Sequence, residues 1–158
     1  MSASAHKVQQ TLDAAGVTAQ VKEMPATTRT AKEAAAAIGC SVAQIAKSLV
    51  FRTESGQAVL VVASGANRVN ESVLADLVGE SIEKATPDFV REATGYAIGG
   101  VPPIGHAQTL NTWFDDALLD FDLVWAAAGT PFNVFAIEPT ELIRITGGKS
   151  IRLERAKS

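Results

Sequence analysis

One lysine stands in a run of β-forming residues, Ile45-Ala46-Lys47-Ser48-Leu49-Val50-Phe51. If this run is a strand, Lys47 shares a face with Ile45, Leu49 and Phe51. A cation on this apolar face must extend to water, find an anion or line a cavity, because an unpaired buried charge is costly. Lys47 is therefore a candidate anion-binding residue. The alternative is a lysine at the strand's entry that reaches back to water.

A second candidate is the glycine- and proline-rich segment Gly99-Gly100-Val101-Pro102-Pro103-Ile104-Gly105. Glycines let a backbone approach a ligand closely, and two prolines hold that backbone in one shape. Amide groups in such a loop can stabilise negative charge without any titrating side chain. The alternative is a tight corner between strands that needs these residues only for its own dihedral angles.

Conventional catalytic and metal-binding sets are missing from the sequence. His6 and His106 have no obvious Ser or Cys partner with a supporting acid, and neither H-E-x-x-H nor a Walker-type loop occurs. The single cysteine, Cys40, cannot form an internal disulfide or a Cys-rich metal site. We therefore expect no metal and no cofactor. Any catalysis must use positioning, backbone groups or the substrate's own functional groups.

Several other residues are expected to have ordinary structural roles. The acidic pairs Asp115-Asp116 and Asp120-x-Asp122 should lie in solvated loops beside strand ends. Trp113 and Trp125 should pack in the core or at an interface. His106, just past the glycine-rich segment, should lie at the surface.

The composition fits one soluble domain over residues 1–158. The chain has 158 residues, 47% hydrophobic and 20% charged, which is enough to bury a full core. Its net charge of -3 excludes a strongly basic nucleic-acid coat but leaves room for a local basic pocket. The sequence shows no N-terminal signal, and no apolar run approaches the roughly 20 residues that span a bilayer. We therefore expect a cytoplasmic protein without membrane contact.

Local signals place helices and strands around these candidates, in a mixed α+β domain with a largely antiparallel central sheet. Capping boxes at Thr30–Glu33 and Ser41–Gln44 begin two helices, and the second leads into the Lys47 strand. Residues Lys47–Ala63 should form a hairpin with its turn at 53–56. Further helices are expected over Ala5–Ala15, Asn70–Gly79, Thr86–Thr94 and from Glu138, and further strands over Val17–Lys22, Ser81–Ala85, Thr109–Phe114, Leu123–Ala128, Phe132–Ile137 and Ser150–Glu154.

Three segments in this order resemble the YbaK and prolyl-tRNA synthetase-associated (INS-like) editing domain superfamily. They are the Lys47 strand at Ile45–Phe51, the loop segment Tyr96–Gly105, and the strand segment Phe121–Gly129. The resemblance covers roughly Ala5 to Gly147. It implies a single domain with a barrel-like, mixed sheet flanked by helices.

The resemblance also implies a free-standing aminoacyl-tRNA deacylase, which hydrolyses the ester that joins a wrong amino acid to the tRNA 3′ end. In such proteins the lysine that matches Lys47 is essential and holds the terminal phosphate or the aminoacyl-adenosine. The loop that matches Gly99–Pro103 positions the ester and ribose through its backbone. A substrate hydroxyl or bound water attacks the ester. Editing is needed because a synthetase pocket separates amino acids that differ by one methylene by only about 1–3 kcal/mol.

The predicted site follows from these implied roles. The residues predicted to carry catalysis are Lys47, Gly99, Gly100 and Pro103. The residues predicted to bind substrate are Ser48, Val101, Pro102, Thr130, Asn133 and Arg68, with solvated loop charge as the alternative for Arg68. We expect a small aminoacyl group, such as Ser, Thr, Ala, Cys or 2-aminobutyrate, on tRNA-Pro or a related tRNA. In the resembled family, members specialised for alanine on tRNA-Pro tend to have asparagine after the essential lysine and a histidine in the later pocket. This chain has Ser48 at the first position and no histidine after His106, which argues against an alanine-only enzyme.

The expected partner is the aminoacyl-tRNA 3′ end, and we expect a monomer. The low net charge suggests weak affinity for bare tRNA, so a synthetase or an elongation factor could assist. A rival hypothesis is a non-catalytic module, associated with a synthetase, that binds a nucleotide or an aminoacyl-tRNA end. A third is a purely structural partner of a synthetase. Turnover separates the first two, because a binding module protects the ester whereas a deacylase shortens its lifetime.

Overall fold

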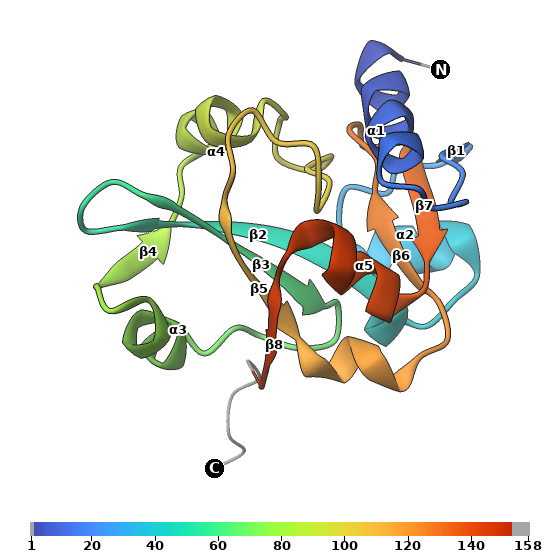
Figure 1. The fold of residues 1–158 in the computed structure, drawn as a ribbon. Helices are drawn as coiled ribbons and strands as arrows, with labels where there is room; N and C mark the ends of the chain where they lie inside the picture. The colour runs from blue at the N-terminus through green and yellow to red at the C-terminus, as the bar shows by residue number, and fades with distance from the viewer. Residues whose placement is uncertain (1, 153–158) are drawn as a thin grey trace.

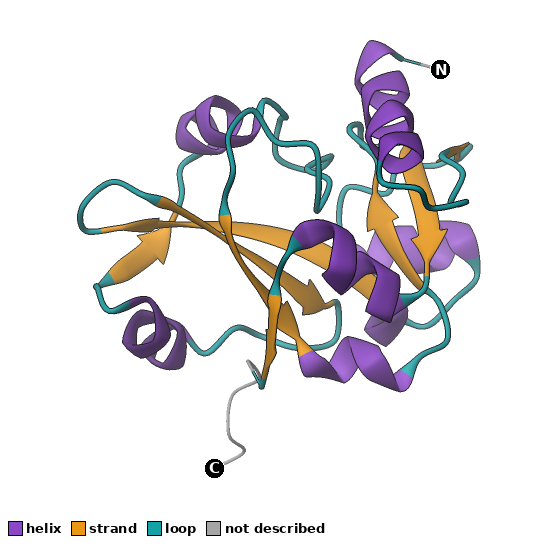
Figure 2. Cartoon of the chain, viewed as in Figure 1, coloured by secondary structure: helices purple, strands orange, loops and turns teal. Residues whose placement is uncertain are grey.

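The structure, a computed structural model, describes residues 2–152. These residues form a mixed sheet with helices packed around it (Figures 1 and 2). The strands are β1 (Lys22–Glu23), β2 (Ile45–Thr53), β3 (Ala58–Ser64), β4 (Ile82–Lys84), β5 (Asn111–Asp115), β6 (Val124–Ala127), β7 (Asn133–Ile137) and β8 (Lys149–Ile151). The helices are α1 (Ala3–Ala14), α2 (Ala31–Ile38), α3 (Glu71–Val78), α4 (Pro87–Thr94) and α5 (Pro139–Thr146), with short 3-10 helices η1 (Val42–Gln44) and η2 (Asp116–Asp120).

Strand β2 is the centre of the sheet. The strand order is β1-β7-β6-β2-β3-β5-β8, and β4 pairs with β2 outside this path. Among the described residues, four pairings are antiparallel, namely β1–β7, β2–β3, β2–β4 and β6–β7. Three are parallel, namely β2–β6, β3–β5 and β5–β8. The predicted α+β fold with a mixed, largely antiparallel sheet is confirmed.

Side-chain caps begin the helices where the sequence predicts. The Oγ1 atom of Thr30 accepts a hydrogen bond from the amide of Glu33 at 3.1 Å. Asn70 and Thr86 cap α3 and α4 in the same way. Helix α2 ends at Gly39, whose φ of 86° lies in the left-handed region that favours glycine. These local signals set the residues at which α2, α3 and α4 begin and the residue at which α2 ends.

Strands β2 and β3 form the predicted hairpin, whose two faces pack against different helices (Figure 1). Leu60 and Val62 of β3 belong to the same core cluster as Val90 of α4. Val61, which points to the opposite face, clusters with Leu74 of α3. Because strand side chains alternate between faces, both faces of this hairpin are buried, which explains its continuous apolar sequence.

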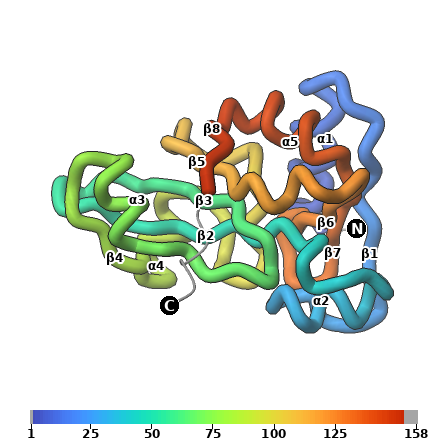
Figure 3. Tube along the Cα trace, turned by 90° about the horizontal axis from the view of Figure 1, so that it is seen from below, coloured from blue at the N-terminus to red at the C-terminus, as the bar shows by residue number. Residues whose placement is uncertain are grey.

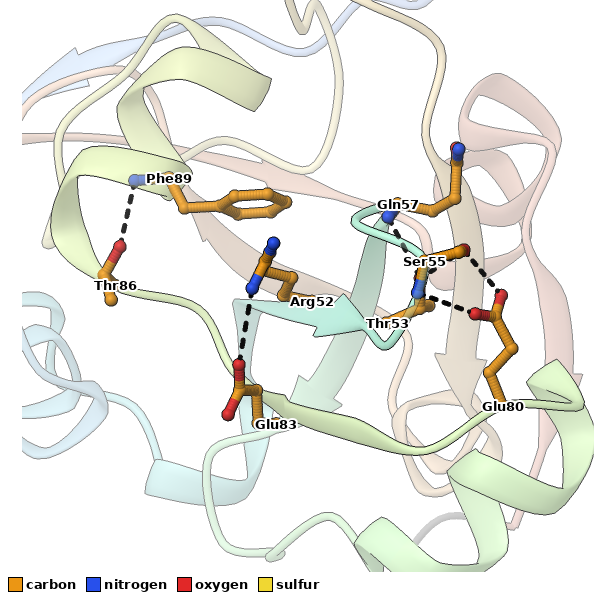
Figure 4. A network of polar contacts seen from close by, with 8 residues as sticks. All are labelled: Arg52, Thr53, Ser55, Gln57, Glu80, Glu83, Thr86 and Phe89. Atoms are coloured by element: carbon orange, nitrogen blue, oxygen red, sulfur yellow. Dashed lines mark hydrogen bonds and ion pairs between the residues drawn. The ribbon is translucent and has the colours of Figure 1, made fainter.

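Polar contacts fasten the turn end of the hairpin to its neighbours (Figure 4). The amide and hydroxyl of Ser55 donate hydrogen bonds to the Glu80 carboxylate, at 2.9 and 3.0 Å. The Arg52 guanidinium lies 3.7 Å from a Glu83 carboxylate oxygen, and 5.7 Å from the centre of the Phe89 ring. These contacts hold β4 and α4 beside β2.

The view in Figure 3 separates two groups of elements along the sheet. Helices α3 and α4 and strand β4 surround the hairpin at one end. Helix α2 lies at the other end, together with β1, β6 and β7. Strand β2 runs through both groups, so residues in its middle lie where the two groups meet.

The strand expected over Val17–Lys22 is wrong for most of its length, because only Lys22 and Glu23 pair with β7. The preceding segment is bonded to α1 instead. The side chain of Gln9 accepts a hydrogen bond from the amide of Val21 at 2.7 Å and donates one to the carbonyl of Ala19 at 3.1 Å. A side chain therefore satisfies backbone groups that a neighbouring strand would otherwise bond.

The C-terminal segment differs slightly from its prediction. Strand β8 covers Lys149–Ile151, whereas residues 153 and 154 of the expected strand lie outside the described residues. Within the described part of the chain, no helix combines the length and the apolar character that crossing a membrane requires.

Candidate functional site

The edge of β2 that faces away from β3 has no strand neighbour in the middle of the strand, among the described residues. Strand β6 pairs only with Ile45 and Ala46, and β4 pairs only with the stretch Phe51–Thr53. Between them, within the described residues, stretch 47–50 has no strand neighbour on this edge. A cleft of about 820 Å³ lies along this part of β2, bordered by residues of β4 and β6.

The backbone of Ser48 points toward the open edge. The Ile45 carbonyl accepts a hydrogen bond from Gly65 on the β3 side, whereas the Val50 carbonyl accepts one from Ala85, next to β4. Successive residues of a strand direct their amide and carbonyl groups to alternate edges, so Ser48 shares the direction of Val50. The amide and carbonyl of Ser48 are therefore available to a ligand in the cleft.

Lys47 lines this cleft, half-buried, and donates a hydrogen bond from Nζ to the carbonyl oxygen of Asn67 at 2.8 Å. Burial lowers the pKa of Lys47, the Asp115 carboxylate opposes this effect, and the positive charges of Arg68 and Lys84 lower the pKa further. Among the described residues Lys47 forms no ion pair. A partly desolvated ammonium without a carboxylate partner is suited to binding an anionic ligand.

Three further cations, Arg29, Arg68 and Lys84, line the same cleft. The ion pairs of the described residues lie elsewhere, so these side chains have no carboxylate partner there. Glu71 is the only carboxylate side chain among the described lining residues. The cleft is therefore locally positive although the whole chain carries a net charge of -3. The sequence analysis predicted Arg68 as a substrate-binding residue but did not predict Arg29 or Lys84 in the cleft.

The glycine-rich loop brings backbone donors to the cleft. Gly99 and Val101 line it, and Gly99 has a φ of 96°, a conformation that favours glycine. The amide of Gly100 donates to the carbonyl of Ala97 at 3.2 Å. In the part of the chain that the structure describes, the amides of Gly99 and Val101 have no protein acceptor. Two free amides in a loop whose residues line a cationic cleft are candidate donors of the kind that stabilise an oxyanion.

Close packing behind the loop explains both of its first two glycines. A Cβ atom on Gly100 would lie 2.8 Å from the backbone of Thr130, and the Gly100 carbonyl accepts a hydrogen bond from Gly129 at 2.9 Å. A Cβ atom on Gly99 would lie 2.8 Å from Cγ of Arg29. Gly100 therefore meets backbone that cannot easily move, whereas Gly99 meets a flexible side chain.

His106 holds the far end of the same loop. Its Nε2 atom lies 2.7 Å from the carbonyl oxygen of Pro102, within hydrogen-bond distance. Burial lowers the pKa of His106, although the contact with Pro102 partly opposes this. The expectation of a surface histidine is wrong, because this side chain is half-buried and bonded. Pro103 lies beside His106 on a smaller cavity of about 360 Å³, away from the main cleft.

Thr130 lies in the β6–β7 turn and Asn133 is the first residue of β7. Neither is among the residues that line the main cleft. The hydroxyl of Thr130 donates to Oδ1 of Asn133 at 2.5 Å. Asn133 is 2% exposed, and its Nδ2 atom has no hydrogen-bond partner among the described residues. These two side chains organise the turn against which Gly100 packs.

The predicted residues therefore fall into two layers. Those that line the cleft are Lys47, Ser48, Arg68, Gly99 and Val101. Those that lie behind it are Gly100, Pro102, Pro103, Thr130 and Asn133.

Asp115 is buried, so the expectation of a solvated loop is wrong for this residue. It is 1% exposed and accepts hydrogen bonds from the amide of Ser64 at 3.0 Å, Nδ2 of Asn67 at 3.1 Å and the amide of Ala117 at 3.0 Å. Three donors compensate for the lost hydration of a carboxylate. A local signal for this role exists, because aspartate commonly caps the first turn of a helix, here η2.

The two tryptophans have different environments. Trp113 is 7% exposed in the cluster that contains Phe51 and Leu74, so its predicted core role is confirmed. Trp125 is half-buried, and its side chain both packs against the cluster of Ile45 and forms part of the cleft wall. Trp125 therefore contributes an aromatic surface to the cleft.

Comparisons with known proteins agree on one family. Residues 25–145 match the family described as "Aminoacyl-tRNA editing domain". The chain is 34% identical over 129 residues to "Uncharacterized protein YwhH" of Bacillus subtilis, a match that covers 82% of each chain. It is 33% identical over 97 residues to "Proline--tRNA ligase" of Nitratidesulfovibrio vulgaris, which covers 61% of this chain and 17% of the ligase.

A solved structure supports the same relationship. It is named "Crystal structure of a putative trans-editing enzyme for prolyl tRNA synthetase" and superposes with a TM-score of 0.93. The two chains are 48% identical, and the match covers 99% of each. The range that matches the family model, residues 25–145, contains Lys47, the loop Gly99–Pro103 and the β6–β7 turn.

Proposed function

Because the chain belongs to the aminoacyl-tRNA editing domain family, we propose that it is a free-standing aminoacyl-tRNA deacylase. It hydrolyses the ester between a small, mismatched amino acid and the 3′ end of a tRNA. The observation that carries this proposal is the combination, in one cleft, of unpaired cations with free loop amides. The cations can bind the phosphates of a tRNA end, and the loop amides can stabilise the negative charge that develops during ester hydrolysis.

Lys47 is proposed as the main anion-binding group. One of its three N–H donors is used by Asn67, so the others remain for a phosphate of the terminal nucleotide. A charge-assisted hydrogen bond of this kind contributes about 1.5–3 kcal/mol. Arg68 extends the same positive surface from the loop after β3.

The chemical step needs no protein nucleophile. A water molecule or a neighbouring ribose hydroxyl attacks the ester carbonyl carbon, and the carbonyl oxygen takes up negative charge. The amides of Gly99 and Val101 are the proposed donors to that oxygen. The bond between the carbonyl carbon and the ribose oxygen then breaks, and the proton lost by the attacking group passes to that ribose oxygen. With water, the products are the free amino acid and the tRNA; attack by a ribose hydroxyl moves the acyl group within the ribose, and water then releases it.

The open edge of β2 suggests how the amino acid itself is oriented. The carbonyl of Ser48 is an acceptor at this edge, and we assign it to the α-ammonium group of the aminoacyl moiety. Thr130 and Asn133 are proposed to influence amino-acid selection through the turn that supports Gly100. The proposed substrates are Ser, Thr, Ala, Cys or 2-aminobutyrate on tRNA-Pro or a related tRNA. Similarity to part of a proline–tRNA ligase supports the choice of tRNA.

The test is the deacylation rate of tRNA-Pro charged with each of these amino acids and with proline. Wild type should release one or two small groups rapidly, and Lys47→Ala should lower kcat/KM about 10- to 100-fold. Lys149→Ala is the matched control, because Lys149 lies over the Trp113 ring outside the cleft. Equal losses in the two variants would show that Lys47 has no special role.

The rival function is a binding module that holds the aminoacyl-tRNA end without hydrolysing it. It predicts that wild type slows the spontaneous loss of the amino acid, and that Lys47→Ala removes this protection. Repeating the assay with the cognate synthetase or elongation factor present tests whether a partner delivers the substrate.

A further inference from the structure

We propose that Asp115 and Asn67 form a positioning pair that holds the Lys47 ammonium in place for the reaction. This inference rests on the proposed deacylase function and deepens it. Asp115 fixes the loop after β3, and the Asn67 carbonyl of that loop orients Lys47. Asn67 touches the ammonium while Asp115 acts through Asn67, so both are positioning residues and neither contacts the reacting atoms.

Asp115 joins two segments that are about 50 residues apart in the chain, namely the end of β3 with the loop after it, and the end of β5 with the start of η2. Its Oδ2 atom accepts hydrogen bonds from the amide of Ser64, at the end of β3, and from Nδ2 of Asn67. Its Oδ1 atom accepts one from Ala117, at the start of η2. Asp115 itself is the last residue of β5. A buried carboxylate with all its donors on neighbouring elements fixes their relative positions.

The loop after β3 is fastened at Asn67 and at Gly65, two residues before it. The amide of Asn67 donates to the Ser64 carbonyl at 3.0 Å, which closes a tight turn. The amide of Gly65 donates to the Ile45 carbonyl at 2.7 Å, which ties the turn to the start of β2. A Cβ atom on Gly65 would lie 2.8 Å from Cβ of Ala31, so the turn also packs closely against α2. The Asn67 carbonyl is therefore held in a defined place.

The charge around Lys47 also favours this arrangement. Asp115, Arg68 and Lys84 are the charged groups that act on the pKa of Lys47, and Arg29 and Glu71 line the same cleft. Among the groups that act on this pKa, Asp115 is the negative one, yet Asn67 stands between it and Lys47. A direct ion pair would occupy the ammonium and compete with a phosphate. The neutral Asn67 carbonyl instead accepts one N–H of the Lys47 ammonium, and the Asp115 carboxylate beyond it stabilises the positive charge. The other N–H donors of Lys47 stay free.

The test compares Asp115→Asn with Asp120→Asn, which removes the same charge from an exposed residue at the end of η2. In Asp115→Asn, one carboxylate oxygen becomes an NH2 group, which faces an N–H donor whichever way the side chain turns. The substitution also removes the negative charge near Lys47. We expect kcat/KM to fall about tenfold, the size of a lost hydrogen bond to a charged group. We also expect the alkaline limb of the pH–rate profile to move to lower pH, whereas Asp120→Asn should leave both unchanged.

A second variant, Asn67→Ala, keeps the backbone carbonyl but removes the bond from Nδ2 to Asp115. Asn67 is half-buried in a loop, so this variant carries the test if Asp115→Asn does not fold. It should shift the alkaline limb in the same direction. A purely structural role would lower the unfolding temperature of either variant without moving the pH–rate profile.

A measurement without substrate tests the positioning pair independently of the proposed deacylase activity. Competitive labelling of amines with acetic anhydride across a pH series, read by peptide mass spectrometry, reports the titration of Lys47 directly. A titration of Lys47 that moves to lower pH in Asp115→Asn and Asn67→Ala, but not in Asp120→Asn, supports the positioning pair. Unchanged titration in folded variants overturns it. Lack of deacylation by wild type would instead refute the deacylase function, and the labelling result would still decide this inference.

Discussion

At the scale of single residues, Ser48 combines a cost in stability with a position at the cleft. Its side-chain oxygen is buried and has no hydrogen-bond partner among the described residues, while the residue lines the cleft. A buried hydroxyl without a partner is destabilising, since it has lost its bonds to water. Such a group is expected where substrate supplies the missing partner, because stability and function then make opposite demands.

We therefore expect Ser48→Ala to raise the free energy of unfolding of the unliganded protein by about 1 kcal/mol. The same variant should hydrolyse aminoacyl-tRNA more slowly than wild type. Urea denaturation and steady-state deacylation measure the two effects. Ser72→Ala is the control, because Ser72 also lines the cleft but its side-chain oxygen is not among the buried atoms without a partner. A less stable Ser48→Ala protein would contradict the assignment of an unsatisfied hydroxyl.

At the scale of elements, the loop Gly99–Pro103 depends on the turn behind it. Its second residue touches the backbone of Thr130, and its carbonyl groups are bonded to Gly129 and His106. The loop is thus supported at several points, which is what a backbone receptor requires, since a donor must be in place before charge develops.

Gly100→Ala should therefore push the loop away from the β6–β7 turn. We expect a loss of about 1–3 kcal/mol in unfolding free energy, the usual size for overpacking a close contact. The variant should also lower kcat for deacylation, because the donors of Gly99 and Val101 move. Gly148→Ala is the matched control, since its Cβ atom would be nearest to two side-chain atoms at 3.2 Å. Thermal unfolding and steady-state kinetics give both results. Equal kinetic losses in the two variants would contradict a special role for the loop.

The elements with local signals could be predicted from the sequence. The capping side chains of Thr30, Asn70 and Thr86 lie within three residues of the amides they bond, so a single sequence reveals them. The β2–β3 hairpin is also local. The predicted roles of Lys47 and the glycine-rich loop came from residue chemistry and family resemblance, and the structure places both at one cleft.

Other parts of the site depend on contacts between distant segments, which the sequence pattern does not reveal. Arg29 precedes a helix cap and Lys84 ends a short strand, positions where solvated charges are common. Only the fold brings them to the cleft of Lys47. Asp115 looked like part of an acidic loop, because the donors from Ser64 and Asn67 come from about 50 residues earlier in the chain.

At the scale of the whole molecule, charge is unevenly distributed. The chain carries a net charge of -3, yet four cations line one cleft. On the proposed function, the acidic remainder opposes long-range attraction to tRNA, whereas the positive cleft would attract phosphates that reach it. This distribution favours recognition of one end of the nucleic acid over binding along its length.

The affinity for deacylated tRNA should accordingly depend only moderately on salt. If all four cations contact phosphates of a single strand, the slope of log Kd against log salt should not exceed about 3. Arg29→Gln should reduce this slope by about 0.7, whereas Arg91→Gln, an exposed substitution on α4, should not change it. Fluorescence anisotropy with labelled tRNA measures these values. A much steeper slope would indicate an extended phosphate-binding surface.

The gap between β4 and β6 also bears on how the protein avoids aggregation. An unpaired strand edge invites another chain to add a strand and begin an ordered aggregate. Here, among the described residues, the stretch without a strand neighbour covers only residues 47–50, and the Val50 carbonyl is already bonded to Ala85. Paired strands close this stretch at both ends, and the charged side chains of Lys47 and Lys84 lie beside it. A foreign strand would need a longer, less charged edge to gain enough hydrogen bonds. The short interruption in which we propose that a nucleotide end binds is therefore a poor template for an added strand.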